Sequence, residues 1–305
     1  MSAQQLQAIL QMAAQNPPPA PATPVQLRAW FDASNVQMPP APGLSVQTMR
    51  IPNAAGGTMA AELLSTPQLA DPRKLIIYYH AGGFVFGSLN SHRALCSYLA
   101  QYSGSQVLNV DYRLAPEHAA PAAHEDALAA YQWALANGYA ASAIALAGDS
   151  AGGNLALSTA VRARDLGMPL PAAIAVMSPG LDLASDGDSH RTVDDPFITP
   201  ELMGFFNAMY APDGDLRSPR ITPFYSADLK GLPPVQLQVG SRERLRDDAV
   251  TMAERLKAAG VEAECTVWDG MVHCWQLFAP ALDEALESLT KASNFIAAHQ
   301  RTGAS

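Results

Sequence analysis

A serine between glycines is the first group in this sequence that could act as a nucleophile. Ser150 lies in the run Gly148-Asp149-Ser150-Ala151-Gly152, after an apolar stretch and before one rich in alanine and leucine. A strand, a sharp turn and a helix in this order expose a serine hydroxyl at the helix N-terminus, and glycines allow the backbone to approach its neighbours closely. A turn with a helix-capping serine would share the pattern, so catalysis by Ser150 depends on partners elsewhere in the chain.

A second glycine-containing loop could hold negative charge. The apolar run Leu75–Tyr79 leads into His80, Ala81, Gly82 and Gly83. Backbone N–H groups that no side chain obstructs can stabilise the oxyanion of an acyl-transfer transition state. We expect the donors to be Gly82, Gly83 and the amide of Ala151, and we expect His80 to order this loop by hydrogen bonding. A simple glycine turn is the alternative.

A histidine and three carboxylates in the last third of the chain could complete a catalytic triad. His273 follows the alternating run Val261–Trp268, and the order serine, acid, histidine favours it as the general base. Glu243 lies just beyond the apolar run Val235–Val239, where a carboxylate could hold the Nδ1–H of the base. Asp247 and Asp248 fall where a helix should start, so capping or dipole roles explain them, but they remain alternative acids.

Short apolar runs and longer helical patterns alternate along the chain and indicate an α/β fold. The runs are Leu75–Tyr79, Gln106–Val110, Ile144–Ala147, Ile174–Met177 and Val235–Val239, and helical patterns such as Ser91–Tyr102 and Glu125–Asn137 separate them. This order predicts a mostly parallel central sheet with helices on both faces. In such sheets ligands bind beyond the carboxyl ends of the strands.

Prolines and composition divide the chain into four parts. Residues 1–45 carry two helical patterns, and residues 46–185 and 218–305 form the two parts of a catalytic core. Residues 186–217 are rich in Asp and Pro and contain a helical pattern at Glu201–Met209. We expect this insertion and the N-terminal helices to form a cap over the site.

The composition excludes several partners. The 305 residues have a formal net charge of -9 and no block of Lys and Arg, so we expect neither nucleic acid nor stable membrane association. The three cysteines, Cys96, Cys265 and Cys274, are expected to be free thiols. Without a leader pattern or a long apolar stretch, the chain is expected to be cytoplasmic. No metal-ligand motif such as H-E-x-x-H occurs, so no metal is expected.

The motifs together resemble the hormone-sensitive lipase family of esterases. They are His80–Gly83, Ser91–Arg93, Asp111–His118, Pro121–Asp126, Gly148–Gly152, Ser178-Pro179 and Gly270–His273. The resemblance implies an α/β-hydrolase fold with a helical cap. It also implies a serine carboxylesterase that hydrolyses short-acyl esters of small molecules through an acyl-enzyme and needs no cofactor. The sequence departs from the family pattern at Ala81, where the family usually has glycine. The run Gly240–Leu245 is similar to the branch of the family that has Glu as its acid.

Further expectations are less specific. A homodimer is expected from the family, and we predict substrate contacts for four aromatic residues: Phe84, Phe205, Phe206 and Phe278. Asp111, Arg113 and Glu117 are expected to pair and hold a loop beneath the site, and Asp149 to anchor loops. An acyltransferase, peptidase or amidase with the same triad, and a ligand-binding receptor on this fold, remain alternatives.

Overall fold

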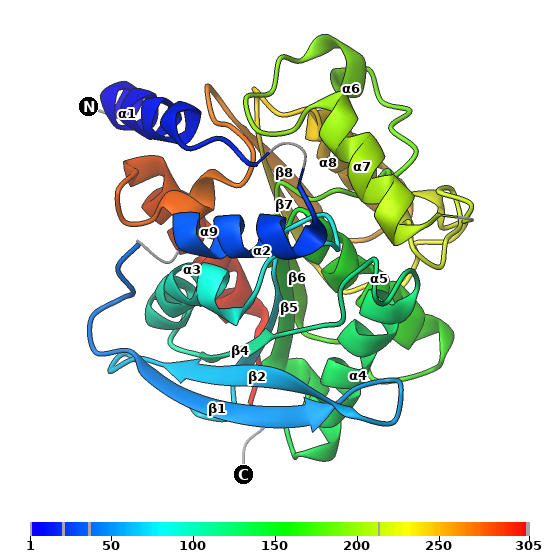
Figure 1. Ribbon diagram of the computed structural model, residues 1–305. Coiled ribbons are helices and arrows are strands. Elements are labelled where there is room, and N and C mark those ends of the chain that lie inside the picture. The colour runs from blue at the N-terminus through cyan, green and yellow to red at the C-terminus, as the bar shows by residue number, and fades with distance from the viewer. Residues whose placement is uncertain (1, 20–21, 36–37, 213, 303–305) are drawn as a thin grey trace.

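The computed structural model describes residues 2–19, 22–35, 38–212 and 214–302. Within them, eight strands form one central sheet in the order β1-β2-β4-β3-β5-β6-β7-β8 (Figure 1). The strands are β1 (Ser45–Pro52), β2 (Thr58–Ser65), β3 (Leu75–Tyr79), β4 (Gln106–Val110), β5 (Ile144–Asp149), β6 (Ala173–Met177), β7 (Val235–Gly240) and β8 (Ala263–Trp268). β2 runs antiparallel to β1 and β4, and all other neighbours are parallel. The predicted mostly parallel α/β sheet is confirmed.

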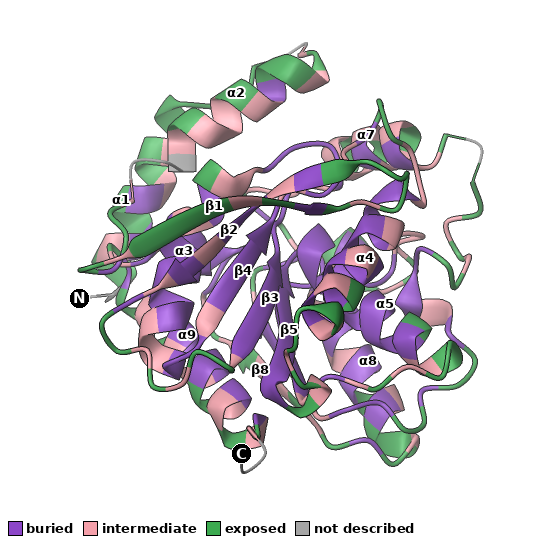
Figure 2. Ribbon diagram, turned by 90° about the horizontal axis from the view of Figure 1, so that it is seen from below, coloured by how far each residue is buried: buried purple, intermediate pink, exposed green. Residues whose placement is uncertain are grey.

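Helices cover both faces of the sheet. α3 (Leu89–Ser103) and α9 (Asp283–His299) lie on one face, and α4 (Ala122–Ala136), α5 (Ala151–Asp165) and α8 (Arg246–Ala258) lie on the other (Figure 1). Side chains of β3 alternate between the two sides: Ile76 packs with the α3 and α9 cluster, and Ile77 with the α4 and α5 cluster. Both faces of the inner parallel strands β3, β5, β6 and β7 are therefore buried, as their continuous apolar runs require (Figure 2).

The strands β1 and β2 were not anticipated from the sequence. Most residues of β1 are exposed, and β1 forms one edge of the sheet (Figure 2). An exposed edge strand has no continuous apolar run, because only one of its faces and one of its edges pack against the protein. The signal that revealed the buried parallel strands is therefore missing in β1.

Local signals set the ends of the helix that follows the glycine loop. The hydroxyl of Ser88 accepts hydrogen bonds from the amides of Asn90 and Ser91, and the Ser91 hydroxyl accepts one from the Ser88 amide. This capping box starts α3. Gly104 ends the helix in the left-handed conformation at φ 63°, which glycine adopts without a steric penalty.

Helices also form in the two segments that were predicted to make a cap. α1 (Ser2–Gln15) and α2 (Pro24–Asn35) precede the sheet, and α6 (Ser189–Thr192) and α7 (Pro200–Tyr210) lie between β6 and β7. Arg28 of α2 donates to the carbonyl oxygens of Val85 and Ala115. α2 is thus joined to the loop that follows β3.

Two further findings concern the described residues as a whole. Cys96, Cys265 and Cys274 are free thiols, as predicted. None of the helices in the described ranges is long and apolar enough to cross a membrane.

Candidate active site

The side chains singled out in the sequence lie beyond the carboxyl ends of parallel strands. Ser150 follows β5, the glycine loop follows β3, Glu243 follows β7 and His273 follows β8. Because these strands are parallel, their carboxyl ends share one edge of the sheet. Groups from four distant parts of the chain meet there.

Ser150 occupies a strained turn between β5 and α5. Its backbone has φ 51° and ψ -119°, outside the conformations that a side chain normally favours. Its amide donates to the carbonyl of Met177 at 3.0 Å. A Cβ on Gly152 would lie 1.8 Å from the carbonyl oxygen of Tyr79, so only glycine permits this close approach of α5 to β3. The crowded turn projects the hydroxyl from the helix N-terminus.

An unbroken chain of hydrogen bonds joins the predicted triad. The Nε2 atom of His273 lies 3.0 Å from Ser150 Oγ, and Nδ1 lies 2.9 Å from Glu243 Oε2. The exposed fractions are 9% for Ser150, 8% for His273 and 0% for Glu243. An ionised carboxylate can only accept, so Nδ1 carries a proton and Nε2 of the neutral ring can accept from the hydroxyl.

A serine that the sequence analysis did not assign to the site supports the carboxylate. Ser178 Oγ donates to Glu243 Oε1 at 2.8 Å and accepts from the amide of Cys274 at 3.1 Å. The Gly240 amide also donates to Glu243 Oε1. The available signal was the Ser178-Pro179 pair directly after an apolar run, at the same edge of the sheet as the other groups.

Asp247 and Asp248 lie in the first turn of α8, where a helix start was expected. Asp247 accepts from the Ser189 amide, and Asp248 accepts from the amides of Leu181 and Asp182. Their hydrogen bonds therefore hold the start of the insertion against α8. Glu243 is the carboxylate that the structure bonds to the imidazole.

Asp182, His190 and Asp248 form the one group in the described ranges with the composition of a metal site. His190 Nε2 lies 2.7 Å from Asp248 Oδ1, and the Tyr225 hydroxyl donates to Asp182, whereas His190 Nδ1 has no partner within the described ranges. The contact between His190 and Asp248 joins α6 to α8. No sequence motif marks the group because its members lie far apart along the chain.

The charge of Glu243 changes the acidity of His273. Burial alone would lower the pKa of His273, but the hydrogen bond and the negative charge of Glu243 outweigh burial. Together they raise the pKa of His273 above its ordinary value of 6.5. The imidazolium form, which any proton transfer from Ser150 would create, is therefore stabilised.

The glycine loop follows β3, which pairs with β5, the strand that leads to Ser150. Gly82 has φ 124°, and a Cβ there would lie 2.2 Å from the carbonyl oxygen of Phe86, so a side chain would displace the loop. Within the described ranges, the amides of Gly82, Gly83 and Ala151 have no protein acceptor. Donors left unpaired at one site can bind an external oxygen atom.

His80 orders this loop, as the sequence predicted. Its Nδ1 lies 2.8 Å from the Ala81 carbonyl oxygen, and its ring stacks on Tyr112 at 4.2 Å between centroids. The Tyr112 hydroxyl donates to the His80 carbonyl. Burial lowers the pKa of His80 to about 3, so the ring is neutral and poorly suited to act as a base.

The four predicted substrate-contacting aromatics lie in different surroundings. Phe206 of α7 packs directly on Gly83, since a Cβ there would come 2.5 Å from the ring. Phe205 makes an edge contact with Phe206, and half-buried Phe278 lies 6.0 Å from Phe197. Phe84 is 3% exposed and stacks on Tyr210 at 4.0 Å, which leaves its ring little surface for a ligand.

The expected pairing among Asp111, Arg113 and Glu117 is wrong. Arg113 instead binds Asp126 of α4 at 2.8 Å, and Glu117 binds Arg28 of α2 at 2.6 Å. The packing of α4 and α2 against the loop brings in these partners. Each charge therefore joins the loop to a different helix.

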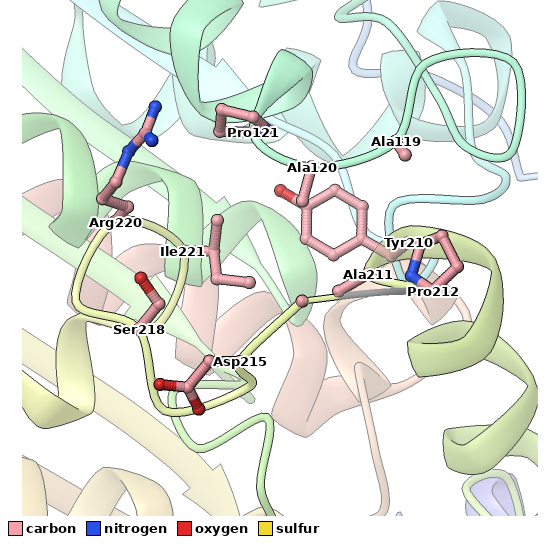
Figure 3. A pocket seen from close by; sticks show the side chains of 11 residues that line it. Ala119, Ala120, Pro121, Tyr210, Ala211, Pro212, Asp215, Ser218, Arg220 and Ile221 are labelled. Carbon is pink, nitrogen blue, oxygen red and sulfur yellow. The ribbon is translucent and has the colours of Figure 1, made fainter.

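A surface pocket of about 370 Å³ lies beside the end of α7 (Figure 3). Tyr210, Ala120 and Ile221 are among the residues around it. The Tyr210 hydroxyl lies 2.6 Å from His124 Nδ1, and His124 Nε2 lies 2.9 Å from Asn154 of α5. Ser150 does not line this pocket.

Comparison with known sequences finds relatives that are described as hydrolases or esterases. A family model described as the alpha/beta hydrolase fold matches residues 76–277. An acetyl-hydrolase of Streptomyces hygroscopicus is 39% identical over 232 residues, which cover 75% of this chain and 77% of that protein. An esterase of Acinetobacter venetianus is 34% identical over 276 residues, covering 89% of this chain and 88% of that protein.

Solved structures of esterases superpose on nearly the whole chain. An esterase from the bacterial hormone-sensitive lipase family superposes with a TM-score of 0.91 at 38% identity, covering 97% of this chain and 98% of that chain. The crystal structure of EstE5 soaked with p-nitrophenyl butyrate superposes with a TM-score of 0.89 at 33% identity and covers the same shares.

Proposed function

This chain belongs to the bacterial hormone-sensitive lipase family of α/β-hydrolase esterases, and on that premise we propose that it is a serine carboxylesterase acting on short-acyl esters of small molecules. The observation that carries the proposal is the hydrogen-bonded chain from Ser150 through His273 to Glu243. The amides of Gly82, Gly83 and Ala151 follow neighbouring strands of the same sheet and have no acceptor within the described ranges. Nucleophile, base and oxyanion donors are the parts that acyl transfer requires.

The mechanism follows from the donors and acceptors at the site. Nε2 of His273 takes the proton of the Ser150 hydroxyl while Oγ attacks the ester carbonyl, and Glu243 stabilises the resulting imidazolium. The amides of Gly82, Gly83 and Ala151 hold the oxyanion. His273 then gives its proton to the departing alcohol, which leaves an acyl group on Ser150. Water activated by the same imidazole hydrolyses this acyl-enzyme.

We propose that the N-terminal helices and the segment 186–217 form a cap that limits the substrate. Phe206 of α7 packs on Gly83, so one wall of the site comes from the insertion. A bulky ring so close to the proposed oxyanion donors leaves room for a small acyl group, which favours short chains. The ester soaked into the EstE5 crystals, p-nitrophenyl butyrate, has the size that this argument suggests.

The acyl-enzyme can be observed directly. When the protein is mixed with p-nitrophenyl butyrate and quenched in acid, we expect one butyryl group on the peptide that contains Ser150, together with a burst of p-nitrophenol. Peptide mass spectrometry and rapid-mixing absorbance measure these. Steady turnover without any modified Ser150, after rapid quenching, would contradict the proposal. Competing alcohols and amines in the same assay distinguish hydrolysis from acyl transfer.

The pKa of His273 predicts how activity depends on pH. The base must be neutral to accept the Ser150 proton, and Glu243 raises its pKa above 6.5. We therefore expect kcat/KM to rise with pH through an apparent pKa above 6.5, measured with an uncharged ester. A midpoint at or below 6.5 would contradict this.

Stability should depend on the same group in the opposite sense. The folded-state pKa of His273 is raised, so its charged pair with Glu243 contributes fully below the unfolded value of 6.5. This contribution is lost as pH rises through the folded-state pKa. Catalytic activity should therefore rise over the same pH range in which this contribution to folding stability is lost.

A further inference from the structure

Two buried histidines hold the residue that precedes the proposed oxyanion donors. His80 and His92 are both 0% exposed, and their rings lie 5.5 Å apart. His80 contacts the carbonyl oxygen of Ala81, and His92 Nε2 lies 3.1 Å from the Ala81 amide nitrogen. Both polar groups of the Ala81 backbone are therefore bound by imidazoles.

The hydrogen bonds of Ser91 determine which nitrogen of His92 carries a proton. The Ser91 hydroxyl donates to the Ser88 carbonyl at 3.0 Å, which uses its only hydrogen. It also lies 2.9 Å from His92 Nδ1. With its hydrogen directed to the Ser88 carbonyl, the hydroxyl acts as acceptor in this contact, which assigns the donor role to Nδ1.

The Ala81 amide determines the state of the other nitrogen. Ala81 is 4% exposed, and within the described ranges its N–H has no acceptor other than His92 Nε2. An N–H on Nε2 would instead point to Asp149 Oδ2, 3.3 Å away, and would leave the Ala81 N–H without an acceptor. A neutral ring with its proton on Nδ1 satisfies both contacts.

Asp149 offers the competing arrangement. Its Oδ2 lies 3.3 Å from His92 Nε2, and its Oδ1 accepts from the Tyr78 hydroxyl at 2.8 Å. A second proton on His92 would bond to Asp149, at the expense of the bond from Ala81. A buried N–H without a partner is unfavourable. Asp149 and Ser150 are neighbours, so this contact lies directly behind the turn that carries the nucleophile.

We propose that His92 is a positioning residue for the oxyanion hole: neutral and protonated on Nδ1, it accepts the Ala81 N–H through Nε2. The inference rests on the proposed function. His80 binds the carbonyl of the Ala81–Gly82 peptide, whose other end is the Gly82 N–H. With both sides of Ala81 held, the Gly82 amide keeps a single direction before substrate arrives, which is the preorganisation that oxyanion stabilisation requires.

Two substitutions at one position test the acceptor. In His92→Gln, the side-chain oxygen can accept from Ala81, whereas His92→Leu fills similar space without an acceptor. We expect His92→Leu to lower kcat about 10- to 100-fold with KM changed about 2-fold or less, because losing a whole oxyanion donor typically lowers kcat 10²–10³-fold. His92→Gln should restore most of the loss. Unfolding midpoints show whether both variants fold.

Wild-type kcat in a folded His92→Leu variant would overturn the inference, and so would equal losses in both variants. A test without substitution uses wild-type protein labelled with ¹⁵N-histidine, with His92 assigned by the signals missing in His92→Gln. Long-range ¹H–¹⁵N spectra should show protonated Nδ1 and unprotonated Nε2, and a protonated Nε2 overturns the inference. If the wild type forms acyl-Ser150 in that case, the proposed function stands. Absence of acyl-Ser150 refutes the function itself.

Discussion

Replacing Ser150 by alanine should lower kcat for p-nitrophenyl butyrate by on the order of 10⁶-fold, the loss that removal of a triad serine causes in a serine protease. The substitution removes the oxygen that lies 3.0 Å from His273 Nε2. It leaves the proposed base and the proposed oxyanion donors in place, so a small residual rate above that of water is expected. Initial rates at saturating ester, with enzyme concentration raised to detect slow turnover, measure the effect.

A matched control separates nucleophile loss from damage to the helix. Ser158 lies on the same helix, α5, where its hydroxyl donates to Asn154 Oδ1 at 3.0 Å. Ser158→Ala removes one buried hydroxyl from α5 without touching His273, so kcat should stay near that of the wild type. Ordinary ester turnover by Ser150→Ala, with the butyryl group found elsewhere, would exclude Ser150 as the nucleophile.

The second large effect is expected at the acid. Glu243→Gln keeps the size of the side chain but removes the charge that stabilises the imidazolium, and its amide group can face Nδ1 and favour the wrong tautomer. The equivalent neutral replacement in a serine protease lowers kcat about 10⁴-fold. We expect a loss of that order here. Rates measured across the pH range distinguish it from a simple shift of the profile.

Asp247→Asn is the discriminating control for Glu243. Asp247 was an alternative acid from the sequence, and its carboxylate instead accepts from the Ser189 amide at 2.8 Å. We expect this variant to keep kcat near the wild-type value, with any change confined to stability. A large loss in Asp247→Asn combined with normal activity in Glu243→Gln would reverse the assignment of the acid.

The insertion is bonded to the segment that carries Glu243. The amide of Arg244 donates to Asp195 at 3.1 Å, and its guanidinium donates to the carbonyl oxygen of Ile198 at 3.0 Å. Asp195 is 4% exposed, and its charge also helps to raise the pKa of His273. The proposed cap therefore contributes both a wall near Gly83 and part of the support of the acid.

Much of the fold could be predicted because its strongest signals are local. The bounds predicted for Leu75–Tyr79 and Gln106–Val110 are those of β3 and β4, and the pattern at Glu201–Met209 lies within α7. A strand buried on both faces needs a continuous apolar run, and a helix with one buried face needs a repeat near 3.6 residues. β1 was not predicted because an exposed edge strand requires neither of these patterns.

The sequence by itself determined where a nucleophile, a base and a glycine loop could stand, because each requires a particular short pattern after a strand. Only the tertiary structure decided which groups meet. It bonded Glu243 rather than Asp247 to His273, and it placed Ser178 behind that carboxylate. It also gave Arg113 the partner Asp126. Hydrogen bonds act over about 3 Å between residues far apart in the chain, so strand order and helix packing select the partners.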